Sequence, residues 1–157
     1  VGCGRGAGAD LILKRFQVER ICAMDLDPDM IRRIRGYLPR DHAERVVAYA
    51  GDLTHLPHPD EPFDAVFGFG VLHHVPDWRR ALAEVARVLK VGGVYFLEEI
   101  YPTVYQNFVT RHILLHPTYD RFASTDLKEA LNRTQLSLRH ALECQLVGIL
   151  AILVKTG

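Results

Sequence analysis

The chain alternates short apolar runs with longer amphipathic segments, and this alternation constrains its fold more than any other feature. The short runs have the length of buried strands, whereas the longer segments repeat their apolar residues at helical spacing. Strands that alternate with helices form a mostly parallel sheet with helices on both faces. The predicted strands are residues 18–24, 46–50, 63–69, 94–97, 136–145 and 146–155.

Local signals predict where the helices begin and end. A capping residue followed by an apolar helical repeat marks a helix start, and the sequence carries this signal at Asp27 and at Asp77. Pro28 supports the first of these, because proline is favoured in the first helical turn. Glycine commonly ends a helix, so the helix after Asp77 is predicted to stop at Gly92 and Gly93.

The C-terminal part of the chain predicts one more helix and a pair of strands. Ser124 or Thr125 is expected to cap the helix, whose apolar positions follow at helical spacing. The strands at 136–145 and 146–155 are joined so tightly that they are predicted to be antiparallel neighbours.

Composition narrows the class of protein. The 157 residues suit a single domain, 1–157, and 48% of them are hydrophobic. Lys+Arg and Asp+Glu each number 19, so no net field attracts nucleic acid or an anionic membrane. Apolar runs stay below the roughly 18 residues of a membrane span, which predicts no integral membrane segment. Three scattered cysteines without a CxxC pair favour a reducing cytoplasm.

Special residues follow the predicted strands where each strand ends. Gly4, Asp25, Asp52 and the segment 68–74 all occupy such positions. Ligands of open α/β sheets bind at the carboxyl ends of the strands. The sequence therefore predicts a ligand site at this edge of the sheet.

The glycine-rich start and Asp25 indicate a nucleotide-like ligand. Glycines at 2, 4, 6 and 8 let the backbone turn sharply and approach a ligand closely. Asp25 lies 21 residues beyond Gly4, where a carboxylate can accept hydrogen bonds from both hydroxyls of a ribose. The same pair suits the looser dinucleotide pattern GxGxxA, so an NAD-dependent oxidoreductase stays open, as does a glycine loop without a ligand.

Five motifs together resemble the class I S-adenosylmethionine-dependent methyltransferases. They are VGCGRG at 1–6, AMDLDP at 23–28, GDLTHLP at 51–57, FDAV through VLHHVPD at 63–77, and VLKVGG at 88–93. The resemblance implies an α/β, Rossmann-like, doubly wound and mostly parallel sheet with an antiparallel last strand. It also implies an incomplete N-terminus, with the first strand largely missing, because the family's acidic residue before the first glycine would precede Val1.

The resemblance assigns expected roles to ten residues around S-adenosylmethionine. The glycine turn would pass beneath the amino acid part of the cofactor, one carboxylate would bind the ribose, and the remaining residues would contact the adenine or the methionyl part. The residues of the turn are Gly2, Cys3, Gly4 and Gly6, and the ribose carboxylate is Asp25. Leu26, Asp52 and the Leu53 N–H would contact the adenine, and Gly68 and Phe69 would lie near the methionyl part.

His73 and His74 are the candidate catalytic residues. Either could orient or deprotonate an acceptor, since histidine titrates near neutral pH. The alternative is that one of them caps the loop and packs. No metal site is expected: His112 and His116 are four residues apart, but Ile113 stands where a zinc protease motif has Glu. Residues 101–122 are either a wall of the acceptor cavity or part of the core.

The resemblance implies transfer of a methyl group from S-adenosylmethionine to a small-molecule acceptor. Two alternatives remain open at this point. One is an NAD-dependent oxidoreductase on a related fold, which explains the glycine turn and Asp25 but not the later motifs. The other is a non-catalytic member that binds the cofactor, or nothing, and serves as a partner subunit.

Overall fold

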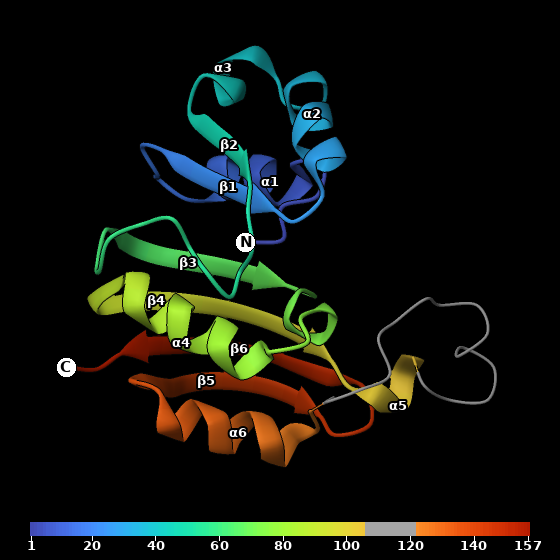
Figure 1. The fold of residues 1–157 in the computed structure, drawn as a ribbon, viewed down its shortest axis with the longest axis vertical. Coiled ribbons are helices and arrows are strands. Elements are labelled where there is room, and N and C mark those ends of the chain that lie inside the picture. The colour runs from blue at the N-terminus through green and yellow to red at the C-terminus, as the bar shows by residue number, and fades with distance from the viewer. Residues whose placement is uncertain (106–121) are drawn as a thin grey trace. The chain divides into compact units, whose positions relative to one another are not determined.

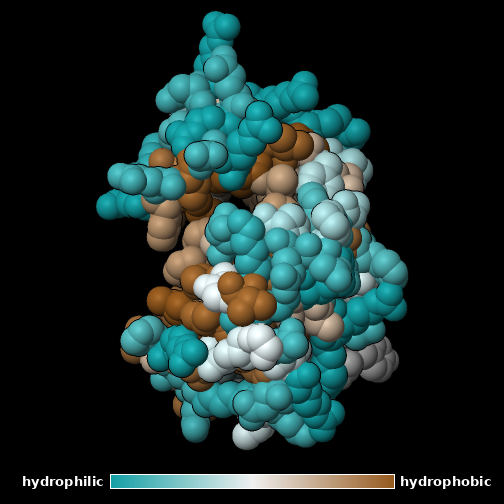
Figure 2. All heavy atoms as spheres, turned by 90° about the vertical axis from the view of Figure 1, so that its left-hand side faces the viewer, coloured by the Kyte–Doolittle hydropathy of each residue, from teal (hydrophilic) through white to brown (hydrophobic). Residues whose placement is uncertain are grey.

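The computed structural model describes residues 1–105 and 122–157 (Figure 1). The chain separates into two compact units, Val1–Asp52 and Leu53–Gly157. Each unit is described by itself. On the face drawn in Figure 2, hydrophilic side chains occupy most of the surface and apolar ones gather in smaller groups.

The first unit is a two-stranded parallel sheet with three helices. Strand β1 (Ile21–Asp25) pairs in register with β2 (Val46–Ala50), so both strands end at the same edge. The helices are α1 (Ala7–Arg15), α2 (Pro28–Tyr37) and the short α3 (Arg40–Ala43). A buried cluster of Ala23, Ile34 and Leu38 joins α2 to the sheet.

Several predicted boundaries of the first unit are confirmed. Asp27 caps α2 by accepting a hydrogen bond from the Asp29 N–H at 2.8 Å, and Pro28 is the first helical residue. Strand β2 has the predicted bounds, whereas β1 begins at Ile21 and not at residue 18. The ladder starts at Ile21 and Val46, the first residue of β2, so the residues before Ile21 have no partner in this sheet. The Arg45 guanidinium donates to the carbonyls of Val18 and Glu19 instead.

The second unit is a four-stranded sheet in the order β3-β4-β6-β5. The strands are β3 (Phe63–Phe69), β4 (Leu89–Ile100), β5 (Leu136–Cys144) and β6 (Gly148–Lys155). Strand β3 runs parallel to β4, and β6 runs antiparallel to both of its neighbours. The closing strands are therefore antiparallel neighbours, as predicted, and β6 alone opposes the direction of this sheet.

Helices α4 (Trp78–Val88) and α6 (Ser124–Arg133) cover one face of this sheet (Figure 1). A one-turn 3₁₀ helix, η1 (Leu72–His74), precedes α4, and the short α5 (Pro102–Tyr105) follows β4. Side chains that alternate along β4 and β6 are buried toward the helices. They are Tyr95, Leu97, Ile149, Ala151 and Leu153. Among the described helices, none is long and apolar enough to cross a membrane.

The predicted apolar face of α4 is confirmed, because residues 81, 82, 85, 86, 88 and 89 are all buried. Asp77 caps the helix by accepting from the Arg80 N–H at 3.1 Å. The predicted stop at Gly92 and Gly93 is wrong, since the helix ends at Val88 and β4 begins at once. The glycines form an irregular start to β4, where Gly92 has a φ of +81° and a Cβ on Gly93 would lie 2.8 Å from the Lys90 carbonyl oxygen.

The predicted cap of α6 is also wrong. Ser124 is already the first helical residue, and the capping position belongs to Ala123. The Asp126 carboxylate accepts from the Ala123 N–H at 2.8 Å, so the helix start is stabilised from inside its first turn. Ser, Thr and Asp are common both at the capping position and in the first helical turn. The spacing of the apolar residues does not show which of these two positions Ser124 occupies.

Candidate functional site

The glycine turn of the first unit has a backbone that glycine favours. Gly2, Gly4 and Gly6 have φ values of +62°, +51° and +99°, in the left-handed region that costs other residues about 1–2 kcal/mol each. The Cys3 N–H donates to the Met24 carbonyl at 2.9 Å, which ties the turn to β1. Helix α1 begins directly after the turn.

Two glycines of the turn, Gly4 and Gly6, have different surroundings. A Cβ on Gly6 would lie 2.5 Å from Ile34 Cγ1, so glycine there lets α2 approach the turn closely. A Cβ on Gly4 would meet nothing within 4 Å. The side of the turn at Gly4 is therefore open, and a ligand could occupy this space.

Asp25 is held beside the glycine turn, as the sequence predicts for a ribose-binding carboxylate. Its Oδ2 accepts from the Gly4 N–H at 2.8 Å, and its Oδ1 accepts from the Asp27 N–H at 3.0 Å. A carboxylate offers about four lone-pair sites, so both oxygens retain capacity for ligand hydroxyls. Leu26, the predicted adenine neighbour, is 74% exposed.

The end of β2 lies next to the end of β1. The Gly51 N–H donates to the Asp25 carbonyl at 3.0 Å, and the exposed Asp52 follows directly. Asp52 is the last residue of the first unit, and the buried Leu53 is the first of the second. The structure thus brings Gly4, Asp25 and Gly51 together, with Asp52 as the next residue of the chain.

Cys3 is unsuited to nucleophilic chemistry. Burial, together with the nearby Asp25 charge, raises the pKa of the Cys3 thiol to about 11. The thiol is therefore protonated at neutral pH, and thiolate is the nucleophilic form. Its place in the glycine turn is that of a small packing residue.

In the second unit, Gly68 makes room for a buried tyrosine. A Cβ on Gly68 would lie 2.7 Å from the Tyr95 hydroxyl oxygen. Among the described residues no hydrogen-bond partner reaches that hydroxyl, and burial raises the pKa of Tyr95 far above its usual range. Phe69, the next residue, is 42% exposed at the end of β3. Gly68 therefore has a packing role in addition to any role at the cofactor.

A buried carboxylate, Glu99, organises the turn after β3. Its Oε1 accepts from the N–H groups of Val71 at 2.9 Å and Leu72 at 2.7 Å. Its Oε2 accepts from the His73 N–H at 3.3 Å and lies 2.7 Å from His73 Nδ1. A carboxylate acceptor requires the hydrogen of the His73 ring to be on Nδ1, which selects the tautomer. Both side chains are almost fully buried.

The two predicted catalytic histidines therefore differ in environment. His73 is 3% exposed and bound to Glu99, whereas His74 is exposed, with its ring centroid 4.2 Å from that of His73. This arrangement supports the alternative that one histidine of the pair packs. Sequence reasoning missed Glu99, although an acidic residue at the carboxyl end of β4 follows the same rule that selected Asp25.

The predicted cavity wall at 101–122 lies mostly outside the described residues, and so do His112 and His116. Tyr101 and Phe122 are described and buried. The Tyr101 hydroxyl donates to Glu143 Oε1 at 2.7 Å, so this end of the segment belongs to the core of the second unit.

A family model described as a methyltransferase domain matches residues 1–97, which is more than half of the chain. The chain belongs to this methyltransferase family. The matched region contains the glycine turn, Asp25 and the η1 turn. The family resemblance read from the five motifs is thus confirmed, and an NAD-dependent oxidoreductase finds no support in the match.

Two curated relatives come from Mycolicibacterium smegmatis. One is named a probable S-adenosylmethionine-dependent methyltransferase and is 36% identical over 61% of this chain and 35% of its own. The other, a fatty-acid O-methyltransferase, is 39% identical over 62% of this chain and 34% of its own. The match thus spans about a third of the length of these relatives.

A solved structure supports the fold. The S-adenosylmethionine-dependent methyltransferase of Mesorhizobium loti superposes with a TM-score of 0.80 at 18% identity, covering 98% of this chain and 88% of that protein. The predicted class of fold, Rossmann-like with an antiparallel last strand, is confirmed.

Proposed function

We propose that this protein transfers a methyl group from S-adenosylmethionine to a small-molecule acceptor. The observation that carries the proposal is the hydrogen bond from Gly4 N–H to Asp25, because it sets a carboxylate with spare acceptor capacity beside the open side of a glycine turn. This arrangement fits a ligand that carries a ribose. Family membership supplies the reaction type.

The chain's own residues would bind and orient the cofactor. Asp25 would accept the ribose hydroxyls, and the open backbone at Gly4 would lie against the amino acid part. S-adenosylmethionine supplies an activated methyl group on a sulfonium, so the protein contributes mainly proximity and alignment. The predicted roles of Asp52, Leu53 and Phe69 remain part of this proposal.

The relative named a fatty-acid O-methyltransferase supports an acceptor of the apolar small-molecule class. An oxygen acceptor that must lose a proton would need a base nearby. Between the two candidate histidines, the exposed His74 suits that role better, because His73 is buried and bound to Glu99. His73 would then support the turn that presents its neighbour.

The pH dependence of turnover tests the assignment of the base. His74→Ala is expected to remove one limb of the pH profile of kcat/KM, since a general base acts only in its deprotonated form. His73→Ala is expected to lower the stability of the second unit more than His74→Ala does. An unchanged profile in His74→Ala would remove this residue from the mechanism.

Calorimetric titration with S-adenosylmethionine and, in parallel, with NADH tests the proposed cofactor. Saturable binding of S-adenosylmethionine alone is expected. Binding of NADH alone would point to the oxidoreductase alternative. Transfer of a labelled methyl group to any member of a fatty-acid panel would then exclude a non-catalytic partner subunit, whereas cofactor binding without transfer to any acceptor would favour it.

The cellular setting is part of the same proposal. Zero formal net charge supports an acceptor other than nucleic acid. Widely spaced cysteines, all of them free, support a cytoplasmic location. Fractionation of cells that express a tagged protein would test the location, and recovery with the membrane pellet would contradict it.

A further inference from the structure

One face of α4 holds the loop of residues 53–60, which leads from the first unit to β3. The charged residues of that face are Arg80, Glu84 and Arg87, spaced four and three apart, so they form a single stripe along the helix. All three contact the loop, and all belong to the second unit.

Arg87 binds the loop through backbone oxygens. Its guanidinium donates to the Leu56 carbonyl at 3.0 Å and to the His58 carbonyl at 2.7 Å. It also donates to Asp60 Oδ1 at 3.0 Å. Contacts to two main-chain carbonyls restrict the path of the backbone, which a surface ion pair between side chains does not do.

Glu84 completes the binding of the same peptide segment. Its Oε2 accepts from the Leu56 N–H at 2.8 Å, while Arg87 donates to both of its oxygens at 2.8 Å. The hydrogen bond from Arg87 lowers the pKa of Glu84, because it stabilises the charged form of the carboxylate. The N–H and the C=O of Leu56 are thus both held by one bidentate Arg–carboxylate pair.

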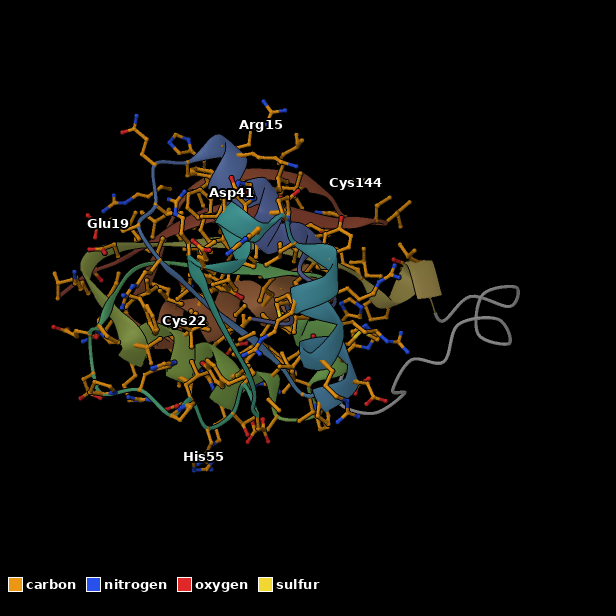
Figure 3. The ribbon with its side chains drawn as sticks, turned by 90° about the horizontal axis from the view of Figure 1, so that it is seen from above. Arg15, Glu19, Cys22, Asp41, His55 and Cys144 are labelled. Carbon is orange, nitrogen blue, oxygen red and sulfur yellow. The ribbon has the colours of Figure 1, made fainter. Side chains whose placement is uncertain are left out.

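Arg80 extends the stripe toward the start of the loop. Its Nε donates to the Thr54 carbonyl at 3.0 Å, and its terminal nitrogen lies 2.7 Å from a ring nitrogen of His55. The His55 ring points outward (Figure 3), and both His55 and Arg80 are exposed. Leu53 and Leu56 are 4% and 7% exposed, and they anchor the loop from beneath.

We propose that Arg80, Glu84 and Arg87 are positioning residues for the cofactor, because they order the loop that carries the Leu53 N–H. This inference rests on the proposed function, in which that N–H meets the adenine. A loop that is already ordered in the folded protein loses little conformational entropy when the cofactor binds, so binding is stronger. When a binding-competent conformation is only partly populated, the apparent affinity falls by that fraction.

The decisive variant is Arg87→Met, which keeps the aliphatic stem and removes the contacts to Leu56 and His58. Its dissociation constant for S-adenosylmethionine, measured by calorimetry well below the unfolding midpoint, is expected to rise about tenfold. Glu84→Gln is a milder change and is expected to give a smaller rise in the same direction. The matched control is Arg133→Met, because Arg133 is exposed on α6 and pairs with Glu129.

Hydrogen exchange at the Leu56 amide reports loop order without any ligand. Exchange is expected to quicken in Arg87→Met and Glu84→Gln and to stay unchanged in Arg133→Met. The preference of the protein for adenine over another nucleobase in the ligand is a second measurement, and general destabilisation of the fold does not change it. The preference for S-adenosylhomocysteine over its inosine analogue is expected to shrink in Arg87→Met and to persist in the control.

The outcomes separate this inference from the function on which it rests. If the unaltered protein fails to bind S-adenosylmethionine, the proposed function is wrong and the inference falls with it. If the unaltered protein binds and the stripe variants bind equally well, the inference alone is overturned. The same holds if exchange at Leu56 quickens while affinity and base selectivity stay unchanged.

Discussion

Asp25 and Glu99 are carboxylates at the carboxyl ends of strands, one in each unit, and they differ in the capacity that remains to them. Asp25 is partly exposed and accepts from two backbone N–H groups. Glu99 is 1% exposed and accepts from three backbone N–H groups and one imidazole. Asp25 holds the glycine turn and the residues directly after its own strand, whereas Glu99, on β4, holds the turn that follows the neighbouring strand β3.

The number of unoccupied acceptor sites distinguishes a carboxylate that can bind a ligand from one whose contacts are all structural. A carboxylate has about four lone-pair sites. Contacts within the described residues occupy two of them at Asp25 and all four at Glu99. Asp25 can therefore accept ribose hydroxyls without losing its contacts, whereas Glu99 would have to give up a buried hydrogen bond.

The largest expected effect is on the stability contributed by Glu99. Glu99→Gln replaces a fully satisfied carboxylate with an amide that must place N–H donors against N–H donors. The free energy of unfolding should fall by about 3–5 kcal/mol, because two buried N–H donors lose their acceptor at a cost of about 1–3 kcal/mol each. Urea denaturation measures this loss. The neighbouring Glu98→Gln is the matched control, and an equal loss there would remove the special role of Glu99.

Alanine substitutions at Gly6 and at Gly4 test which side of the glycine turn is open. Gly6→Ala should lower stability by about 3 kcal/mol, because overpacking against Ile34 adds to an unfavourable left-handed φ. Gly4→Ala should cost about 1 kcal/mol, since only the φ is unfavourable. Thermal and urea unfolding compare the two, and equal losses would contradict the proposed difference.

Asp25→Asn tests the spare capacity of the first carboxylate. Affinity for S-adenosylmethionine should fall about thirtyfold, or about 2 kcal/mol, because charged hydrogen bonds to the ribose are lost. Stability should change less than in Glu99→Gln. Calorimetry measures the affinity, and Asp41→Asn on α3, labelled in Figure 3, is the exposed control. Unchanged affinity in Asp25→Asn would count against the proposed ribose contact.

The smallest expected effect on stability concerns Glu143, a carboxylate that pairs with a lysine side chain. The Lys128 ammonium, 2.5 Å from Oε2, is the main cause that lowers the pKa of Glu143 to about 2 from its usual 4.5. A depressed pKa contributes stability above pH 4.5 that is lost as pH falls toward 2. The loss should be about 1 kcal/mol, since Lys128 is 42% exposed and its charge is screened.

Urea unfolding at pH 7 and at pH 3 measures that loss. Lys128→Met should reduce the difference in stability between the two pH values, because the cause of the shift is removed. A pH dependence that is the same in Lys128→Met would show that other groups govern the acid limb.

Much of the local structure could be predicted because its causes are local. The bounds of β2 and β3 and the caps at Asp27 and Asp77 follow from apolar runs and neighbouring side chains. The errors arose where one residue type serves two purposes. Gly92 resembles a helix stop but bends the start of β4, and Ser124 resembles a cap but begins α6.

The sequence by itself determined the order of the elements, the family and the glycine turn with its carboxylate, because these follow from apolar periodicity and from short motifs in a fixed order along the chain. Only the tertiary structure decided which acid would be saturated. His73 and Glu99 lie 26 residues apart, and their contact requires β4 to pair with β3 and turn η1 back over the strand end. Burial and the number of donors are properties of that packing, and no local pattern encodes them.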